Sequence, residues 1–488
     1  MVFPVIGGDG KPTGYEISNS CQFNTDAYCE FTPSSGSGST QFTYSAWVKN
    51  SGAGGQSETG MILSGAGAGS GADNGIQLGT NAKIQFIEYD GGDNAYYIRT
   101  NRLFRDPSAW FHIVLIYDAP DGTAGDRMRL YINGTRETSF SNEVQLPQNR
   151  AHAGFTRNNV AIRVGAQASG SNQRFDGYLA DVYFCDGQNY EPSEFGETND
   201  NGVWIPKEAD VSFGTNGFKL EFKQTGTSAN ASGIGADTSG NDNHFSVSGL
   251  AATNITTDTP TNNFCTINSI FADSGNNTVV ADYSEGNTKM LTTVDGWKFG
   301  RGTFLLTSGK WYVEAKITEE SAGQTGNFGI VPSQGGIVLG GSDDNDVFEG
   351  LRASLGGSDT NLQKLDTGTG SNIFTDLASG DTAMLAIDLD NNKLWVGNEG
   401  TWYNDNNAST TLDASNHDVG LPTVTDGWVF GVGQYRDSSN NLTWEYNWGN
   451  PPNSISSGNA DANGYGNFEF AVPSGFYAVC TKNLAKYG

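Results

Sequence analysis

The sequence predicts an all-β protein made of two antiparallel, jelly-roll-type β-sandwiches with little helix. Of its 488 residues, 66 are glycine, and short apolar runs alternate with segments rich in Ser, Thr, Asn, Asp and Gly. That composition is typical of strands joined by turns. No segment of helical length shows a convincing period of 3.6 residues. Aromatic residues make up 11% of the chain, which is enough to fill sandwich cores, so we do not expect disorder.

Four segments predict strands of a first sandwich. FTYSAWVK (42–49) alternates, with every second residue on one apolar face, and WFHIVLIY (110–117) is apolar on both faces, as a strand between two sheets should be. MRLYI (128–132) also alternates, and the Asn-Gly pair after it tolerates the positive φ of a tight hairpin turn. FDGYLADVYF (175–184) completes the set.

This order of strands resembles the laminin-G/concanavalin-like lectin sandwich, a scaffold that mostly binds surfaces. We assign this lectin-like domain to residues 16–200 and expect an N-terminal docking segment over 1–15. Residues 201–275 are predicted to be a connector that contains short strands of its own, packed between the main domains.

A second sandwich is predicted over residues 276–488. GKWYVEAKI (309–317) alternates with its apolar residues inward, and GDTAMLAIDLDNNKLWV (380–396) forms a hairpin around Asp-Asn-Asn. GWVFGVGQY (427–435) supplies a later strand. This series of motifs resembles a SPRY/B30.2 domain, which implies a second binding-type scaffold.

The order of motifs along the whole chain resembles a family of bacteriophage virion proteins. It includes the long segment 177–208, DTSGNDNHFSVSG (237–249) and FEFAVPSGFYAVCTKNL (468–484). Members of that family are tail-fibre, lectin-like or other structural proteins. The resemblance therefore implies a location in the virion, assembly in the host cytoplasm, and other virion proteins as partners.

Charge and cysteine content narrow the classes of partner and compartment. Twenty-seven basic and 54 acidic residues leave a formal charge of −27, which repels phosphate backbones and anionic membranes, so we expect neither nucleic acid binding nor membrane insertion. The N-terminal MVFPVIGGDG has no basic region and no apolar core, and we therefore expect no signal peptide. The cysteines lack paired spacing, so free core thiols are predicted, with a Cys21–Cys29 bridge as the alternative.

The sequence lacks the common catalytic motifs. We therefore predict that the protein is not an enzyme and has no catalytic residues. Sandwich glycanases carry two carboxylates on one strand face, as in Glu-x-Asp-x-x-Glu, and no such pattern occurs. Glu314 is isolated in its strand, and His112 lies in an apolar strand, where a packed, hydrogen-bonded role is expected. There is no Gly-x-Ser-x-Gly elbow and no His-x-x-x-His pair.

No cofactor is required by these motifs, and calcium is left open. Laminin-G-like domains often hold one calcium ion at the rim of the sandwich, and Asp73 and Asn74 loosely resemble that position. Asp118 and Asp121 belong to a second loop whose clustered carboxylates suit a hard cation. The alternative for each loop is an ordinary β-turn, in which Asp and Asn are common.

The candidate glycan-binding residues are Trp402, Tyr403, Asn404 and Asp405, which place aromatic rings beside amide and carboxylate groups. The alternative is that these aromatic residues end a strand and pack on the core. The leading hypothesis is a tail-fibre or receptor-binding adhesin that recognises host surface polysaccharide. A capsid- or tail-attached decoration or fibre protein is the alternative, and a polysaccharide depolymerase is disfavoured. Whether the chain forms a homo-oligomer is left open, since it has no coiled-coil heptads.

Overall fold

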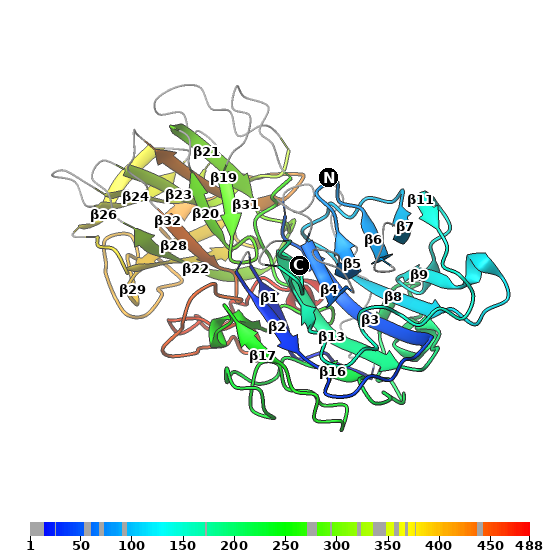
Figure 1. Cartoon of the computed structure of the whole chain (residues 1–488). Coiled ribbons are helices and arrows are strands. Elements are labelled where there is room, and N and C mark those ends of the chain that lie inside the picture. The colour runs from blue at the N-terminus through cyan, green and yellow to red at the C-terminus, as the bar shows by residue number, and fades with distance from the viewer. Residues whose placement is uncertain are drawn as a thin grey trace. The chain divides into compact units, whose positions relative to one another are not determined.

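The computed structural model confirms the all-β fold and divides the chain into two units (Figure 1). The first unit comprises the described residues up to Asn263, and the second begins at Phe264. The structure describes residues 14–24, 26–52, 60–67, 73–89, 95–170, 173–270, 281–292, 295–319, 324–334, 348–355, 361–366, 369–375, 377–436 and 443–488.

The first unit consists of two antiparallel sheets of eight strands each. One sheet has the order β10-β9-β8-β3-β13-β1-β18, with β16 also paired to β13. Its strands are β1 (Ser20–Phe23), β3 (Gln41–Asn50), β8 (Trp110–Asp118), β9 (Met128–Ile132), β10 (Thr135–Arg136), β13 (Gly177–Asp186), β16 (Phe218–Leu220) and β18 (Ile255–Thr256). In Figure 1, β8, β3 and β13 run side by side through the middle of this sheet.

The other sheet of the first unit has the order β11-β7-β6-β5-β4-β12-β2-β17. Its strands are β2 (Tyr28–Phe31), β4 (Gly60–Ala66), β5 (Asp73–Leu78), β6 (Ile84–Tyr89), β7 (Ala95–Thr100), β11 (Phe140–Val144), β12 (Ile162–Val164) and β17 (Ser246–Ser248). A separate hairpin joins β14 (Gly196–Thr198) to β15 (Trp204–Pro206), and single 3₁₀ turns occupy Ala124–Asp126, Pro192–Glu194 and Ala252–Asn254.

Alternation along the strands places the core of the first unit between its two sheets. Phe42 and Tyr44 of β3 share one buried cluster with Ile76 of β5 and Phe86 of β6, from the opposite sheet. Trp47 of β3 points away from that cluster and packs in a smaller one. Strand β8 is buried on both faces, as its unbroken apolar sequence predicts.

The segment that we expected to be a connector differs from that expectation, because residues up to 263 belong to the first unit. Strand β16 pairs with β13, β17 with β2, and β18 with β1. Each of these strands has only two or three residues, too few to form a stable layer alone, so they extend existing sheets. Most of the expected docking segment 1–15 lies outside the described residues.

The second unit also contains two antiparallel sheets. One has the order β19-β20-β32-β22-β27-β28-β29, with β30 paired to β28, and the other has the order β21-β31-β23-β24-β25-β26. The first comprises β19 (Ala281–Ser284), β20 (Lys289–Thr292), β22 (Lys310–Glu319), β27 (Thr382–Asp388), β28 (Lys393–Asn398), β29 (Thr401–Trp402), β30 (Val419–Gly420) and β32 (Thr443–Asn447). The second comprises β21 (Gly296–Arg301), β23 (Gln324–Pro332), β24 (Glu349–Leu355), β25 (Asn361–Asp366), β26 (Thr369–Thr375) and β31 (Trp428–Arg436).

A short helix, α1 (Thr481–Tyr487), ends the second unit. The predicted hairpin between β27 and β28 is present, and Asn392 in its turn has a φ of 55°, a conformation that Asn tolerates. All five cysteines, Cys21, Cys29, Cys185, Cys265 and Cys480, are buried free thiols, which confirms that prediction. In the described part of the chain, no helix is long and apolar enough to cross a bilayer.

Candidate functional site

A cavity of about 350 Å³ opens in the second unit and is lined mainly by polar side chains. Strand β22 contributes Glu314 and Lys316, and β32 contributes Glu445. The turn between β28 and β29 adds Glu399, and a late loop adds Glu469. Residues distant in sequence therefore meet because β22 is paired with both β27 and β32.

Glu314 forms the buried base of this cavity. Its side chain accepts hydrogen bonds from the Tyr312 hydroxyl at 2.8 Å, the backbone N–H groups of Glu469 at 2.9 Å and Phe470 at 2.8 Å, and the Asn447 amide at 3.3 Å. Burial raises the pKa of Glu314 above its ordinary value, and these hydrogen bonds oppose that shift. A carboxylate has about four lone-pair sites, so protein donors occupy the acceptor capacity of Glu314.

The carboxylates nearer the surface have fewer protein partners. Glu445 accepts from Lys289 Nζ at 3.2 Å and from the Asn453 amide at 2.7 Å. Glu469 accepts from the Ser456 hydroxyl and, at 2.8 Å, from the Ser456 backbone N–H. The hydroxyl of Ser456 is the main reason that the pKa of Glu469 is lowered, so Glu469 is ionised at neutral pH.

Two half-buried apolar groups, Phe470 and Ile455, complete the lining of the cavity. These groups suit a ligand rich in hydroxyls. The aromatic ring can cover an apolar face of the ligand, while the carboxylates and the Lys316 ammonium group orient its hydroxyls. The cavity combines both features in one place.

The structure contradicts the predicted exposed aromatic platform at Trp402. The side chain of Trp402 is 4% exposed and packs edge-to-face on Tyr312, with ring centroids 6.2 Å apart. Tyr403 is half-buried against Phe374. The reason is that β29 pairs with β28, which turns the indole into a buried cluster instead of toward solvent.

The two polar members of the same predicted site have different surroundings. Asn404 is buried and holds its own loop, since its amide donates to the Thr411 carbonyl at 2.9 Å and its carbonyl accepts from the Asp413 N–H at 2.9 Å. Asp405 is exposed and lies 3.8 Å from Lys364 Nζ. None of the four predicted residues lines the cavity.

The predicted calcium ligands are occupied by local contacts where the structure describes their side chains. Asn74 accepts a hydrogen bond from the Tyr89 N–H at 2.6 Å, and Asp118 accepts from Gln41 at 2.9 Å. Asp121 accepts from the Thr123 N–H at 2.7 Å, as in an ordinary turn. The backbone of Asp73 belongs to β5, and its side chain lies outside the described residues.

Asp118 and Asp121 lie in one turn, joined by a backbone hydrogen bond, whereas Asn74 is in the opposite sheet. Within the described ranges, no group of three or more His, Cys, Asp or Glu side chains is arranged to hold a metal ion. Calcium binding by this chain therefore stays a prediction.

Sequence reasoning treated Glu314 as isolated and missed the cavity. The sequence did contain one signal of a polar site. Glu314 and Lys316 are charged and lie on the same face of β22, whereas the other face of this strand is apolar. Neither alternation nor motif spacing could show that Glu399, Glu445 and Glu469 would join them.

Comparison with known families supports a lectin-like first unit. Residues 23–188 match the model of the Concanavalin A-like lectin/glucanases superfamily, so the first unit contains a laminin-G/concanavalin-like lectin domain. No curated protein matches the sequence.

Several solved structures are weakly similar to this chain. A putative carbohydrate binding protein from Bacteroides ovatus is 14% identical, with a TM-score of 0.31, over 49% of this chain and 60% of that protein. A heptameric SAP-like pentraxin from Limulus polyphemus is 16% identical, with a TM-score of 0.27, over 36% and 80% of the two chains. The SPRY domain of human HERC1 is 11% identical, with a TM-score of 0.22, over 33% and 87%. Similarities this weak support no conclusion about fold or function.

Proposed function

We propose that this protein is a non-enzymatic adhesin that binds glycans, with a ligand site in the cavity of the second unit. The observation that carries the proposal is the placement of Glu445, Glu469 and Lys316 around one cavity beside the half-buried ring of Phe470. The lectin-like domain of the first unit supports the same class of function.

The size and charge of the cavity restrict the glycan. A volume of about 350 Å³ is near the lower end of ligand pockets, which span about 300–1,000 Å³, so the cavity suits a terminal sugar or a short stretch of a chain. Carboxylates outnumber cations in its lining, and like charges repel an acidic ligand. We therefore expect neutral or amino sugars to bind and uronic acids to be rejected.

The hydrogen bonding of Glu314 supports a binding role over hydrolysis. A glycosidase needs a carboxyl group that can donate its proton to the leaving oxygen, paired with a second carboxylate. Protein donors, two of them backbone N–H groups, already point at both oxygens of Glu314. Incubation with polysaccharide should accordingly leave chain lengths unchanged, whereas chain shortening would favour a depolymerase.

The setting that we propose is the tail fibre of a bacteriophage, where the adhesin would contact polysaccharide on the host surface. The support is the order of sequence motifs, which resembles phage virion proteins. Locating the tagged protein on virions by electron microscopy tests this setting, and density on the capsid would favour the decoration role instead.

A glycan array with the full chain, probed with calcium and with a chelator, tests the glycan-binding proposal. We expect binding to neutral or amino sugars and about fivefold weaker binding by Phe470→Ala, because aromatic contacts contribute about 1 kcal/mol. Tyr403→Ala is the matched control, since it removes a half-buried aromatic residue outside the cavity. Absence of binding under both conditions, or equal losses in the two folded variants, would contradict the proposal.

A further inference from the structure

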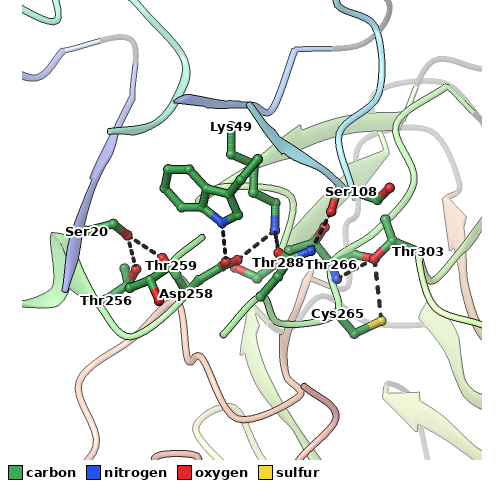
Figure 2. A network of polar contacts seen from close by, with 12 residues as sticks. Ser20, Lys49, Ser108, Thr256, Asp258, Thr259, Cys265, Thr266, Thr288 and Thr303 are labelled. Carbon is green, nitrogen blue, oxygen red and sulfur yellow. Dashed lines mark hydrogen bonds and ion pairs between the residues drawn. The ribbon is translucent and has the colours of Figure 1, made fainter. Parts of the chain in front are cut away.

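A buried amine, carboxylate and carboxamide meet in the first unit. Lys49, on the central strand β3, places Nζ 2.7 Å from Asp258 Oδ2 and 2.7 Å from Asn263 Oδ1. Lys49 is 1% exposed and Asp258 is fully buried. Figure 2 shows the Lys49 side chain reaching down to Asp258.

The surroundings orient each of the three groups. Trp110 Nε1 donates to the other oxygen of Asp258 at 2.9 Å, and the Asn263 amide nitrogen donates to the Ser108 carbonyl at 2.5 Å. The nitrogen of the carboxamide is therefore held away from Lys49, and its carbonyl is presented to the amine. The ring of Tyr178 lies 5.5 Å from Lys49 Nζ and helps to enclose it.

We propose that Lys49 and Asn263 become joined by an intramolecular isopeptide bond between Nζ and Cγ, with Asp258 transferring the protons. The inference goes beyond glycan binding and does not depend on it. It requires only the three groups present, and no oxidant, reductant or added cofactor.

The reaction balances as a transamidation. Asp258 accepts a proton from the Lys49 ammonium group, and the Nζ lone pair attacks Cγ of Asn263 while the carbonyl electron pair moves to Oδ1. Asp258 passes its proton to Nδ2 and accepts a second proton from Nζ. The Cγ–Nδ2 bond then breaks with its electron pair, the carbonyl re-forms, and one neutral ammonia leaves. Asp258 ends protonated, so the buried ion pair has been replaced by neutral groups.

Three physical effects favour this reaction. The reacting atoms are held together by the fold, which removes the entropic cost of bringing amine and carboxamide together. Burial of a charged pair is costly, and the reaction replaces that pair with neutral groups. Exclusion of water disfavours the competing hydrolysis of the carboxamide.

The bond would tie the end of the first unit to the middle of its sheet. Asn263 is the last residue of the first unit, and it is separated from Lys49 by 214 positions in the sequence. Tension applied along the chain at Asn263 would then pass through a covalent bond to β3. Without the bond, that tension would fall on the short ladder of β18, which pairs two residues with β1.

Intact-mass measurement of the full wild-type chain is the direct test. We expect a mass about 17 Da below that of the sequence, the mass of one ammonia, and a protease-resistant linked pair of peptides that contains Lys49 and Asn263. A mass equal to the sequence mass, with the two peptides recovered separately, would overturn the proposal and leave an ordinary buried ion pair.

Variants separate the roles of the three groups. Three variants should each have the full mass expected from their sequence: Lys49→Met, Asp258→Asn and Asn263→Ala. Each should also run more slowly on a denaturing gel than the wild type, because the bond no longer closes the chain between Lys49 and Asn263 into a loop. Asn263→Asp should still link, losing water at about 18 Da. Lys219→Met is the control, since Lys219 is another ion-paired lysine of the first unit, and it should keep the deficit. A mass deficit that persists in Lys49→Met would overturn the proposal. The mass of the wild-type chain remains a valid test even where a variant fails to fold.

Discussion

His112 illustrates at the scale of one residue how burial decides what an ionisable side chain does. Its Nδ1 accepts from the Trp204 indole at 3.1 Å, and an indole nitrogen can only donate. The ring proton therefore sits on Nε2, which contacts the Ser45 hydroxyl at 2.8 Å. Burial lowers the pKa of His112 to about 3, so the imidazole stays neutral and has the packed role that its apolar strand predicts.

The lowered pKa of His112 predicts a pH dependence of stability. Between about pH 6.5 and pH 3 the unfolded chain takes up a proton on this ring that the folded protein excludes, so the free energy of unfolding falls as the pH is lowered. From pH 6.5 to about pH 5 this one group contributes a loss of about 2 kcal/mol. In urea titrations at both pH values, His112→Gln should lose less stability on acidification than the wild type.

The control for this measurement is His417→Gln, which alters a half-buried histidine of the second unit. The variants must be compared with the wild type because another group acts in the opposite direction. Burial raises the pKa of Asp181 to about 6, and a carboxyl group with a raised pKa stabilises the folded protein as the pH falls. An unchanged pH dependence in His112→Gln would show that the imidazole titrates normally in the folded protein.

At the scale of elements, strand β22 organises the candidate site. Its apolar face, with Trp311 and Val313, packs in the core, while Glu314 on the other face binds the backbone of Glu469 and Phe470. The loop that carries the cavity's aromatic ring therefore depends on one buried carboxylate. Glu314 is a positioning residue rather than a contact for the ligand.

Glu314→Gln should weaken the second unit and its ligand binding together. The amide cannot accept all of the hydrogen bonds that the carboxylate accepts, and unsatisfied buried donors cost about 1–3 kcal/mol each. We expect a loss of about 3 kcal/mol in urea unfolding, and weaker glycan binding even where the protein remains folded. Asp405→Asn, at an exposed carboxylate outside the cavity, should change neither. A Glu314→Gln protein within about 0.5 kcal/mol of the wild type would contradict this role.

At the scale of the whole molecule, the boundary between the two units determines which fragments can fold. The core of the first unit includes Phe218, Leu220 and Phe245, which lie beyond the predicted domain end at residue 200. Truncating a large buried apolar side chain of this kind to Ala costs about 2–5 kcal/mol. A chain cut at residue 200 therefore lacks part of its own core.

Fragments test this boundary. The fragment 11–263 should unfold cooperatively on heating and resist limited proteolysis, whereas 11–200 should be degraded and bind a hydrophobic dye. Both fragments lack the second unit, so its absence is matched between them. Equal protease resistance of the two fragments would mean that the segment 201–263 is dispensable, as a connector would be.

Several features of this protein could be predicted from the sequence because they depend on local patterns. Alternation in 42–49 and the unbroken apolar run in 110–117 predict strands, since side chains of a strand point alternately to its two faces. Cysteines without paired spacing predict free thiols. These features need no knowledge of which strands become neighbours.

The tertiary structure decided the features that depend on pairing between distant strands. Trp402 has the sequence context of an exposed platform, yet the pairing of β29 with β28 buries it. The carboxylates of Glu314, Glu399 and Glu445 approach one cavity only because β22 lies between β27 and β32. Lys49 meets Asn263 for the same kind of reason. Periodicity specifies the face of a strand on which a residue lies, whereas the order of strands in the sheet specifies what that residue meets.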